Sequence, residues 1–282
     1  MLDNLLSFIT YDIGIDLGTA NIRIGIKGRG LVGIEPSVVA INKITKQVLA
    51  VGKEAKEMLG KTPANVVAIR PLKDGVIVDF DITLAMIKYF IELVHQNKES
   101  FWIIPKPRVL IGVPSSITDV EKQAVIDAAL YAGAREAFVI EEPMAAAIGV
   151  GMPVNEPMGN MIVDIGGGTT DVAIISLGGI VVDRTINIAG DEMDELIVEY
   201  LREKHSLLIG YSTAEKIKIK IAKAHPEEEE KKMQVYGRDM ISGLPKSVKI
   251  SGSEVMNAIS PALQKITDAI KEAIEDAPPE LV

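Results

Sequence analysis

The sequence of 282 residues contains no cysteine, which excludes disulfides, thiolate metal sites and a cysteine nucleophile. Aromatic residues make up only 4% of the chain against 48% for all hydrophobic residues, so the core must consist mainly of Ile, Val, Leu and Ala. Basic residues are outnumbered, and the formal charge of −9 argues against nucleic acid as a partner. The few histidines, at positions 95, 205 and 225, show no metal-ligand spacing.

Long hydrophobic runs are also absent, since no apolar stretch reaches the ~18 residues that a membrane span requires. The smoothest stretch, 172–182, is interrupted by Ser176, Gly178 and Gly179. The N-terminus lacks the basic region and the cleavage site of a secretory signal. We therefore expect a cytoplasmic protein.

The hydrophobic pattern predicts strands that alternate with helices, and hence an α/β fold. Strands are expected on both sides of a turn in 13–27, 38–51 and 161–176, singly in 108–113 and 137–140, and as a hairpin in 233–250. Helices are expected at 52–59, 82–95, 118–133, 143–148, 191–204, 213–224 and 253–275. Thr118 and Glu121 have the spacing of a capping box, and the acidic run 227–230 indicates a solvated loop.

An internal repeat gives the main indication of function. The first copy is IGIDLGTAN (13–21) and the second is IVDIGGGTTD (162–171). In both copies an Asp ends an apolar strand and is followed by glycine, threonine and a further strand. The stretch 149–159 between them is rich in Gly and Pro, and the chain length suggests about two domains. The sequence therefore predicts two similar halves with one glycine turn each.

Both turns suit the binding of phosphate. Glycines let backbone amides approach phosphate oxygens closely, and threonine hydroxyls add donors. Asp16 and Asp164 would be repelled by phosphate unless a cation intervened, so each implies Mg²⁺, held through water. The pattern predicts a nucleoside triphosphate, ATP with Mg²⁺, between the halves, although the residues do not separate ATP from GTP.

Three other interpretations would account for glycine-rich turns of this kind. A Rossmann turn opens a helix, whereas these turns lead into strands, and the sequence has no Walker A loop. A pair of purely structural glycine hairpins is the remaining alternative. The repeat argues against this alternative, because the same strand–turn–strand pattern restarts after the Gly- and Pro-containing stretch 149–159.

At these residues the sequence resembles the actin, DnaK-type chaperone and sugar-kinase superfamily, and within it the MreB family of bacterial actin homologues. The stretches that carry this resemblance are GIDLGTAN (14–21), EPSVVA (35–40), RPLKDGVIVDF (70–80), PKPRVLIGVPSSITDVE (105–121), IEEPMAAAIG (140–149), VDIGGGTTDVAIISLGGIV (163–181), AGDEMD (189–194) and GLPKSVKI (243–250). They span nearly the whole chain in the family's order.

The resemblance implies an actin-like ATPase fold of two related domains, each a mixed sheet flanked by helices, with the nucleotide cleft between them. The first domain is expected at 1–150, with an inserted subdomain at about 35–78. The second is expected at 151–282, with an inserted subdomain at about 190–258. Family members continue with a second adenosine loop and a closing helix, so we expect the second domain to be C-terminally incomplete and this form to bind nucleotide poorly or to aggregate.

The function implied by the resemblance is a weak ATPase that polymerises into membrane-associated filaments directing cell-wall synthesis and rod shape. The implied partners are further copies of the chain in paired protofilaments, the inner face of the cell membrane, and the cell-elongation and wall-synthesis machinery. Two alternatives remain open: the ATPase domain of a DnaK-type chaperone, and a small-molecule kinase of the same superfamily.

The resemblance also assigns nucleotide-binding residues. The first phosphate turn comprises Gly18, Thr19, Ala20 and Asn21, and the second comprises Gly166, Gly167, Gly168 and Thr169. The adenosine contact is expected at Glu215, Lys216, Ile217 and Lys218. For this last group, an exposed helix with charges four residues apart is an equal alternative.

Hydrolysis requires a water molecule positioned in line with the terminal phosphate. Glu141 and Glu142 precede Pro143 at a helix start, where the helix dipole favours an ionised carboxylate. The family's Glu-Pro motif favours Glu142 as the catalytic residue, with Glu141 as the alternative and Thr169 as a second candidate for positioning water.

Two segments suggest contact with a membrane surface. Phe101, Trp102 and Ile103 lie in an apolar run between polar residues, where the family carries a membrane-insertion loop, and Trp suits the interfacial layer. Leu2, Leu5, Leu6 and Ile9 would share one face of a short helix. The alternatives are packing of the loop on the core, and a frayed N-terminus.

Overall fold

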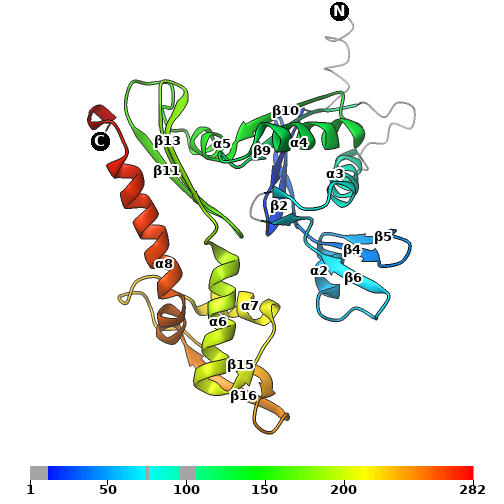
Figure 1. Cartoon of the computed structure of the whole chain (residues 1–282), viewed down its shortest axis with the longest axis vertical. Coiled ribbons are helices and arrows are strands. Elements are labelled where there is room, and N and C mark those ends of the chain that lie inside the picture. The colour runs from blue at the N-terminus through cyan, green and yellow to red at the C-terminus, as the bar shows by residue number, and fades with distance from the viewer. Residues whose placement is uncertain (1–11, 74–75, 96–105, 282) are drawn as a thin grey trace, which may run out of the picture.

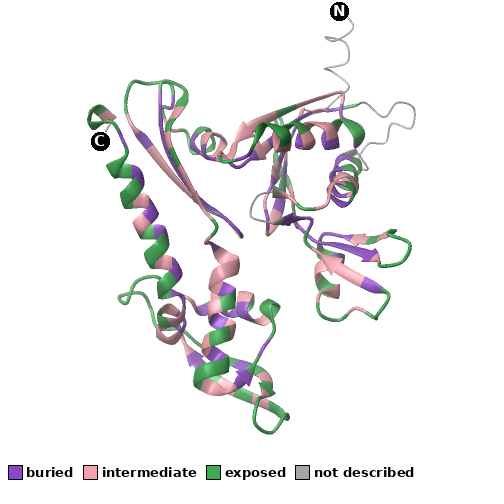
Figure 2. Ribbon diagram, in the orientation of Figure 1, coloured by how far each residue is buried: buried purple, intermediate pink, exposed green. Residues whose placement is uncertain are grey.

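The computed structural model describes residues 12–73, 76–95 and 106–281. In this part of the chain, strands and helices form two groups of layers that face each other across a gap, with helix α5 between them at one end (Figure 1). The predicted α/β fold is confirmed. Buried residues follow the sheets and the inner faces of the helices (Figure 2).

The first group is built on a five-stranded sheet in the order β10-β9-β1-β2-β3. Its strands are β1 (Asp12–Leu17), β2 (Asn21–Ile26), β3 (Gly30–Pro36), β9 (Arg108–Val113) and β10 (Glu136–Glu141). β1 pairs antiparallel with β2 and parallel with β9. In β1 every second residue is buried, so one face of the sheet meets the core.

Helices α3 (Phe80–His95) and α4 (Asp119–Tyr131) contribute to the same hydrophobic core as this sheet. Phe90, Met86 and Ile87 of α3 are completely buried there. The predicted capping box is confirmed, because the Thr118 side chain accepts a hydrogen bond from the Glu121 amide and the Glu121 side chain accepts one from the Thr118 amide.

A smaller sheet extends from the first group. It has the order β5-β4-β6, formed by β4 (Val39–Asn42), β5 (Val48–Val51) and β6 (Val66–Ile69), and it packs on α2 (Lys53–Met58). The short strands β7 (Leu72–Lys73) and β8 (Val76–Ile77) follow. Val38, Ala40 and Ala55 form the small separate core of this sheet and helix.

The second group begins with α5 (Glu142–Gly149) and a sheet in the order β11-β12-β13. The strands are β11 (Asn160–Ile165), β12 (Thr170–Ser176) and β13 (Gly179–Ile186). All seven residues of β12 are buried, because the sheet is covered on both faces. Ala173 and Ile175 pack with Ala147 of α5, whereas Val172 packs with Ala269 of the long helix α8 (Gly252–Glu275).

This packing bears on the expected division of the chain at 150/151. Helix α5 contributes a buried alanine to the core of the second sheet while it follows directly from β10 of the first. It therefore links the two groups, and the expected domain limits remain predictions.

The remainder of the second group lies at the far end of α6 (Gly190–His205). It contains α7 (Tyr211–Ile221) and a sheet in the order β14-β15-β16. The strands are β14 (Leu207–Leu208), β15 (Lys232–Asp239) and β16 (Pro245–Ser251). The predicted 233–250 hairpin is confirmed. The 3₁₀ turn η1 (Pro279–Leu281), which follows α8, lies instead beside the start of β11, where Leu281 faces Gly159.

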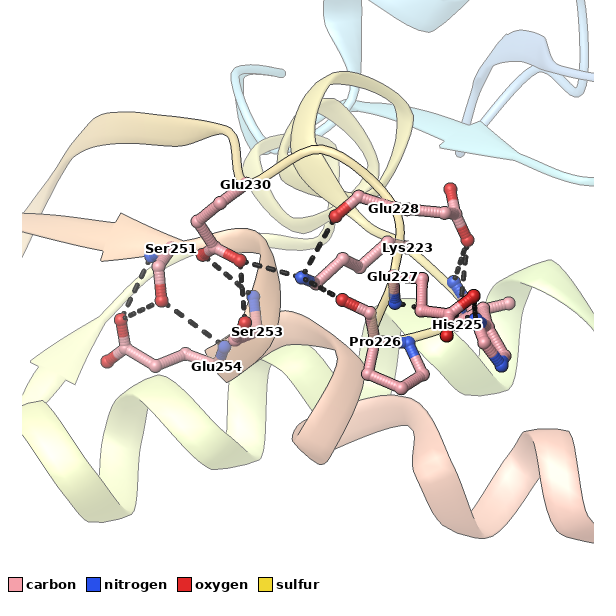
Figure 3. Close-up of polar contacts among 10 residues, drawn as sticks. Lys223, His225, Pro226, Glu227, Glu228, Glu230, Ser251, Ser253 and Glu254 are labelled. Atoms are coloured by element: carbon pink, nitrogen blue, oxygen red, sulfur yellow. Dashed lines mark hydrogen bonds and ion pairs between the residues drawn. The ribbon is translucent and has the colours of Figure 1, made fainter.

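The acidic run 227–230 is an exposed loop, as predicted, and it is anchored by one lysine. The ammonium of Lys223, which is 7% exposed, donates to the carbonyls of Pro226 and Glu228 and lies 2.7 Å from a carboxylate oxygen of Glu230 (Figure 3). Glu230 in turn accepts hydrogen bonds from the amide and the hydroxyl of Ser253 at the start of α8. One buried lysine thus ties the loop to a helix N-terminus.

The two predicted membrane segments, Phe101 to Ile103 and the N-terminal stretch from Leu2 to Ile9, lie outside the described residues. Among the helices that are described, none combines the length and apolar character needed to cross a membrane.

Candidate functional site

A cavity of about 280 Å³ lies between the two groups of layers. Both predicted glycine turns line it, together with the start of α6 and one side of α7. Its lining residues are Asp16, Leu17, Gly18, Thr19, Ala20, Asn21, Arg23, Glu142, Asp164, Ile165, Gly166, Gly167, Thr169, Asp171, Gly190, Asp191, Asp194, Glu215, Lys218 and Ile219.

The two turns touch each other. A Cβ atom placed on Gly167 would come within 2.6 Å of the Ala20 Cβ and 3.0 Å of the Ala20 nitrogen. Within the first turn, a Cβ on Gly18 would come within 2.5 Å of the Asn21 carbonyl oxygen. Because real side chains do not tolerate such distances, both positions require glycine for the observed approach of the backbones.

Helix α6 begins on the second turn. Its N-cap residue, Ala189, has no side chain that could cap the helix. The amides of Gly190 and Asp191 instead donate to the carbonyls of Gly166 and Gly167, at 3.2 and 2.7 Å. These bonds give partners to two of the backbone amides that would otherwise be unpaired at the start of the helix, and they fix the second turn to α6.

Four carboxyl groups converge at the inner end of the cavity. Asp16 ends β1, and Asp164 lies directly opposite Asp171 in the antiparallel pair of β11 and β12. Glu142, from the start of α5, reaches over Gly112, whose Cα faces the Glu142 side chain and the Asp16 backbone. The cluster draws one acidic residue from each of four elements.

Electrostatics in this cluster oppose full ionisation. Burial, followed by repulsion from Asp16, Asp171 and Asp164, raises the pKa of Glu142 from 4.5 to about 8. Burial and the charge of Asp16 raise the pKa of Asp164, and burial raises that of Asp171 despite a hydrogen bond from Thr185. A cation bound between these groups would relieve the repulsion.

Arg23 is the positive group nearest this cluster among the lining residues. Its guanidinium donates to the Asp16 carboxylate at 2.7 Å, and the two residues face each other across β1 and β2. Its charge also lowers the pKa of Glu142 and of Asp164 against the larger effects that raise them.

Thr169 is held by Asp171. The Asp171 carboxylate accepts hydrogen bonds from the hydroxyls of Thr185, at 2.6 Å, and of Thr169. Asp171 is 2% exposed and Thr169 is 6% exposed. Asp171 of β12, which is itself held by Thr185 of β13, thus sets the orientation of the Thr169 hydroxyl at the cavity wall.

Two ion pairs cross from one group of layers to the other at the outer side of the cavity. Lys56 of α2 lies 2.8 Å from Glu215 of α7, and Arg70 lies 2.6 Å from Asp191 of α6. All four side chains are about one quarter to one third exposed. The pairs hold the small sheet of the first group against the helices of the second.

The structure brings most of the predicted site residues together, but not all. Glu142 lines the cavity, whereas Glu141 points away and pairs with Lys122 at 3.5 Å. Of the expected adenosine contacts, Glu215 and Lys218 line the cavity, but Ile217 is buried in the core of the second group and Lys216 is exposed. Gly168 does not line the cavity either.

Several lining residues were not predicted from the sequence. Asp171 could have been found, because it lies seven residues after Asp164, directly across a predicted strand pair. Asp191 and Asp194 lie in the stretch AGDEMD, which carried the family resemblance without an assigned role. No sequence pattern indicated that Arg23 lines a site, because a single arginine in a strand usually faces solvent.

The lining fits Mg²⁺, a hard cation that binds oxygen and keeps much of its water shell. The carboxylate of Asp16 repels those of Asp164 and Glu142 across the inner end of the cavity and contributes to the raised pKa values of these two groups. Among the described residues, no group of three His, Cys, Asp or Glu side chains is arranged to hold a metal ion directly.

Comparison with known proteins gives consistent matches. The family model described as MreB/Mbl protein matches residues 10–282. The chain is 50% identical over 270 residues to the cell shape-determining protein Mbl of Bacillus subtilis (strain 168), covering 96% of this chain and 80% of Mbl. It is 48% identical over 285 residues to the cell shape-determining protein MreB of Escherichia coli (strain K12), covering 100% of this chain and 81% of MreB.

A solved structure is similar over the same extent. MreB5 of Spiroplasma citri bound to ADP shares 41% identity with a TM-score of 0.89, covering 96% of this chain and 80% of MreB5. The same protein bound to AMPPNP gives a TM-score of 0.87.

Proposed function

This chain belongs to the MreB/Mbl family and has an actin-like fold, and from that premise we propose that it binds ATP with Mg²⁺ and hydrolyses the ATP. The observation that carries the proposal is the cavity in which two glycine turns from different halves touch beside four carboxyl groups. The ADP- and AMPPNP-bound states of the MreB5 relative support it.

In this proposal the turns containing Thr19 and Thr169 hold the phosphates with backbone amides and hydroxyls. Asp16 and Asp164 would hold Mg²⁺ through its water shell, and a bound ion would supply positive charge against the phosphates. Glu215 and Lys218 lie at the adenosine end. The expected division into domains 1–150 and 151–282 places one turn in each.

Glu142 orients the attacking water. Its carboxyl group lies at the inner end of the cavity beside Asp16, whereas Glu141 is engaged with Lys122 outside it. Thr169, fixed by Asp171, supplies a second hydrogen bond to the same water. The positive charge of Mg²⁺, when bound, would lower the pKa of Glu142 toward the ionised form that this role requires.

The two glutamates provide a matched test. Glu142→Ala is expected to retain binding of a fluorescent ATP analogue, measured by anisotropy, and to slow phosphate release by roughly 10²-fold or more. Glu141→Ala should leave both nearly unchanged. Equal turnover in all three proteins would refute the assignment, and the absence of any nucleotide binding by the wild type would refute the function itself.

The wider role that we propose is assembly into filaments on the inner face of the cell membrane, in the cytoplasm, where they direct wall synthesis and cell shape. The names of the curated relatives support the shape-determining role. Nucleotide-dependent light scattering with electron microscopy tests self-assembly. A chaperone ATPase or a small-molecule kinase would form no filaments under these conditions.

Membrane contact through Phe101, Trp102 and Ile103 is part of this proposal. Co-sedimentation with liposomes, comparing the wild type with a variant carrying Phe101→Ser and Trp102→Ser, tests it. The variant is expected to remain in the supernatant, whereas equal sedimentation of both proteins would rule the segment out.

A further inference from the structure

Arg23 occupies an unusual position for a cation in this cavity. It lies on β2, directly opposite Asp16 on β1, so that both side chains project from the same face of the sheet. The distance from its guanidinium nitrogen to the Asp16 carboxylate oxygen is 2.7 Å. Asp16 is one of the two residues to which the proposed function assigns hydrated Mg²⁺.

The rest of the cavity offers little positive charge at this end. The other basic residue in its lining, Lys218, is engaged elsewhere, because it donates to the Gly190 carbonyl and lies 2.9 Å from Asp194. Arg23 is therefore the cation that balances Asp16, and its charge also reaches Glu142 and Asp164.

We propose that Arg23 is a resident counter-cation that holds Asp16 when no metal is bound and competes with Mg²⁺ for that carboxylate. This inference rests on the proposed nucleotide site. Water molecules around Mg²⁺ need the carboxylate oxygens of Asp16 as acceptors, and one of these oxygens, Oδ2, accepts from Arg23. The ion and the guanidinium therefore compete for this oxygen.

Two opposite effects of removing the guanidinium follow. Without Mg²⁺, loss of Arg23 leaves the cavity more negative, so that nucleotide phosphates bind more weakly. With Mg²⁺, loss of Arg23 frees Asp16, so that less Mg²⁺ is needed to support nucleotide binding. A direct contact between Arg23 and phosphate would instead weaken binding under both conditions.

The test uses Arg23→Leu, because leucine suits a strand and β2 already carries Ile22 and Ile24 beside this position. Fluorescent ADP is titrated in EDTA, and at fixed nucleotide the concentration of Mg²⁺ is varied. We expect weaker binding in EDTA and a midpoint in Mg²⁺ that falls roughly two- to fivefold, the range for an exposed ion pair. Arg23→Lys should remain close to the wild type.

Lys27→Leu is the matched control. Lys27 pairs with Asp12 across the same two strands at 3.7 Å, but neither residue lines the cavity. Its midpoint in Mg²⁺ should equal that of the wild type. Circular dichroism and thermal unfolding of each variant identify any loss of folding.

The outcomes are distinct. An unchanged or raised midpoint in a folded Arg23→Leu protein overturns the inference, as does weaker binding at saturating Mg²⁺, which would make Arg23 a phosphate contact. A wild type that binds no nucleotide at any Mg²⁺ concentration refutes the proposed function instead.

Discussion

Gly167 lies so close to Ala20 that the two phosphate turns share a surface: a Cβ on Gly167 would come within 2.6 Å of the Ala20 Cβ. The contact joins two segments that lie far apart in the sequence and belong to different sheets. The position of one turn is therefore fixed by the other, and the missing side chain at 167 permits this.

Gly167→Ala should force the turns apart. We expect a loss of about 1–3 kcal/mol in the free energy of unfolding, from overpacking, together with weaker nucleotide binding. Urea denaturation and nucleotide titration measure the two effects. Gly149→Ala is the control, because a Cβ there meets nothing within 4 Å. Equal stability and affinity for both variants would show that the turns can separate without cost.

Glu142 makes stability depend on pH. Its pKa is raised from 4.5 to about 8, chiefly by burial, so the folded chain holds a proton that the unfolded chain releases between these values. The free energy of unfolding should therefore fall as the pH rises from about 5 to 8, by at most about 1.4 kcal/mol per pH unit from this group.

Glu142→Gln cannot ionise and should flatten this slope, leaving only the parts due to Asp164 and Asp171. Without nucleotide, the variant should be more stable than the wild type at pH 8 while hydrolysing ATP far more slowly. Urea denaturation at several pH values measures the slope. Parallel profiles for the two proteins would contradict the buried, protonated state of Glu142.

The pair between Lys56 and Glu215 should slow the release of nucleotide, because it closes the outer side of the cavity. Such a partly exposed pair contributes up to about 1 kcal/mol, so Lys56→Ala should speed the release of fluorescent ADP by roughly two- to fivefold. Stopped-flow displacement measures this rate.

A charge swap, Lys56→Glu with Glu215→Lys, should restore part of the slow release if the pair itself matters. Lys53→Ala provides the control, since Lys53 pairs with Glu35 within its own group of layers. A release rate that is unchanged in Lys56→Ala would mean that the cavity opens elsewhere.

Lys223→Met should destabilise the region around α8. The variant keeps the length of the side chain but removes the Lys223 donor from two carbonyls and from the Glu230 carboxylate, which retains its bonds from Ser253. The free energy of unfolding should therefore fall at neutral pH. Lys220→Met, at an exposed position of α7, should change little. Equal stability of both variants at pH 7 would show that water replaces the Lys223 ammonium.

The same variant should lose its difference from the wild type in acid. The hydrogen bond from Lys223, followed by those from Ser253, lowers the pKa of Glu230 from 4.5 to about 2. The contribution of Glu230 is therefore complete above about pH 4.5 and is lost as the pH falls toward 2. The two unfolding curves should converge over this range.

The sequence was most informative where local chemistry decides the structure. The turns at Asp16 and Asp164, the capping box at Thr118 and the 233–250 hairpin all follow from short-range patterns, and the structure has each of them. The third strands of the sheets, β3 and β13, were not predicted. Neither strand has a regularly spaced set of buried residues, and their pairing with β2 and β12 depends on the neighbouring strand.

Contacts between distant segments could not be predicted. Nothing in the sequence around Lys56 or Arg70 indicates that each faces a carboxylate of the other half, because such pairs depend on how the two groups of layers are oriented. Ile217 shows that a site assigned from family resemblance can also be misplaced. Family position suggested a nucleotide contact, whereas helical periodicity directs the residue into the core beside Ala214 and Ile221.

Helix α6 connects the second glycine turn rigidly to the far end of the second group. Its first amides are bonded to the carbonyls of Gly166 and Gly167, and its 16 residues extend for about 24 Å to the sheet that contains β15 and β16. A tilt of about 5° where the helix meets the turn would move its far end by about 2 Å over that length. If the proposed hydrolysis moves this turn, α6 would carry a small local shift to the far end of the second group as a larger displacement.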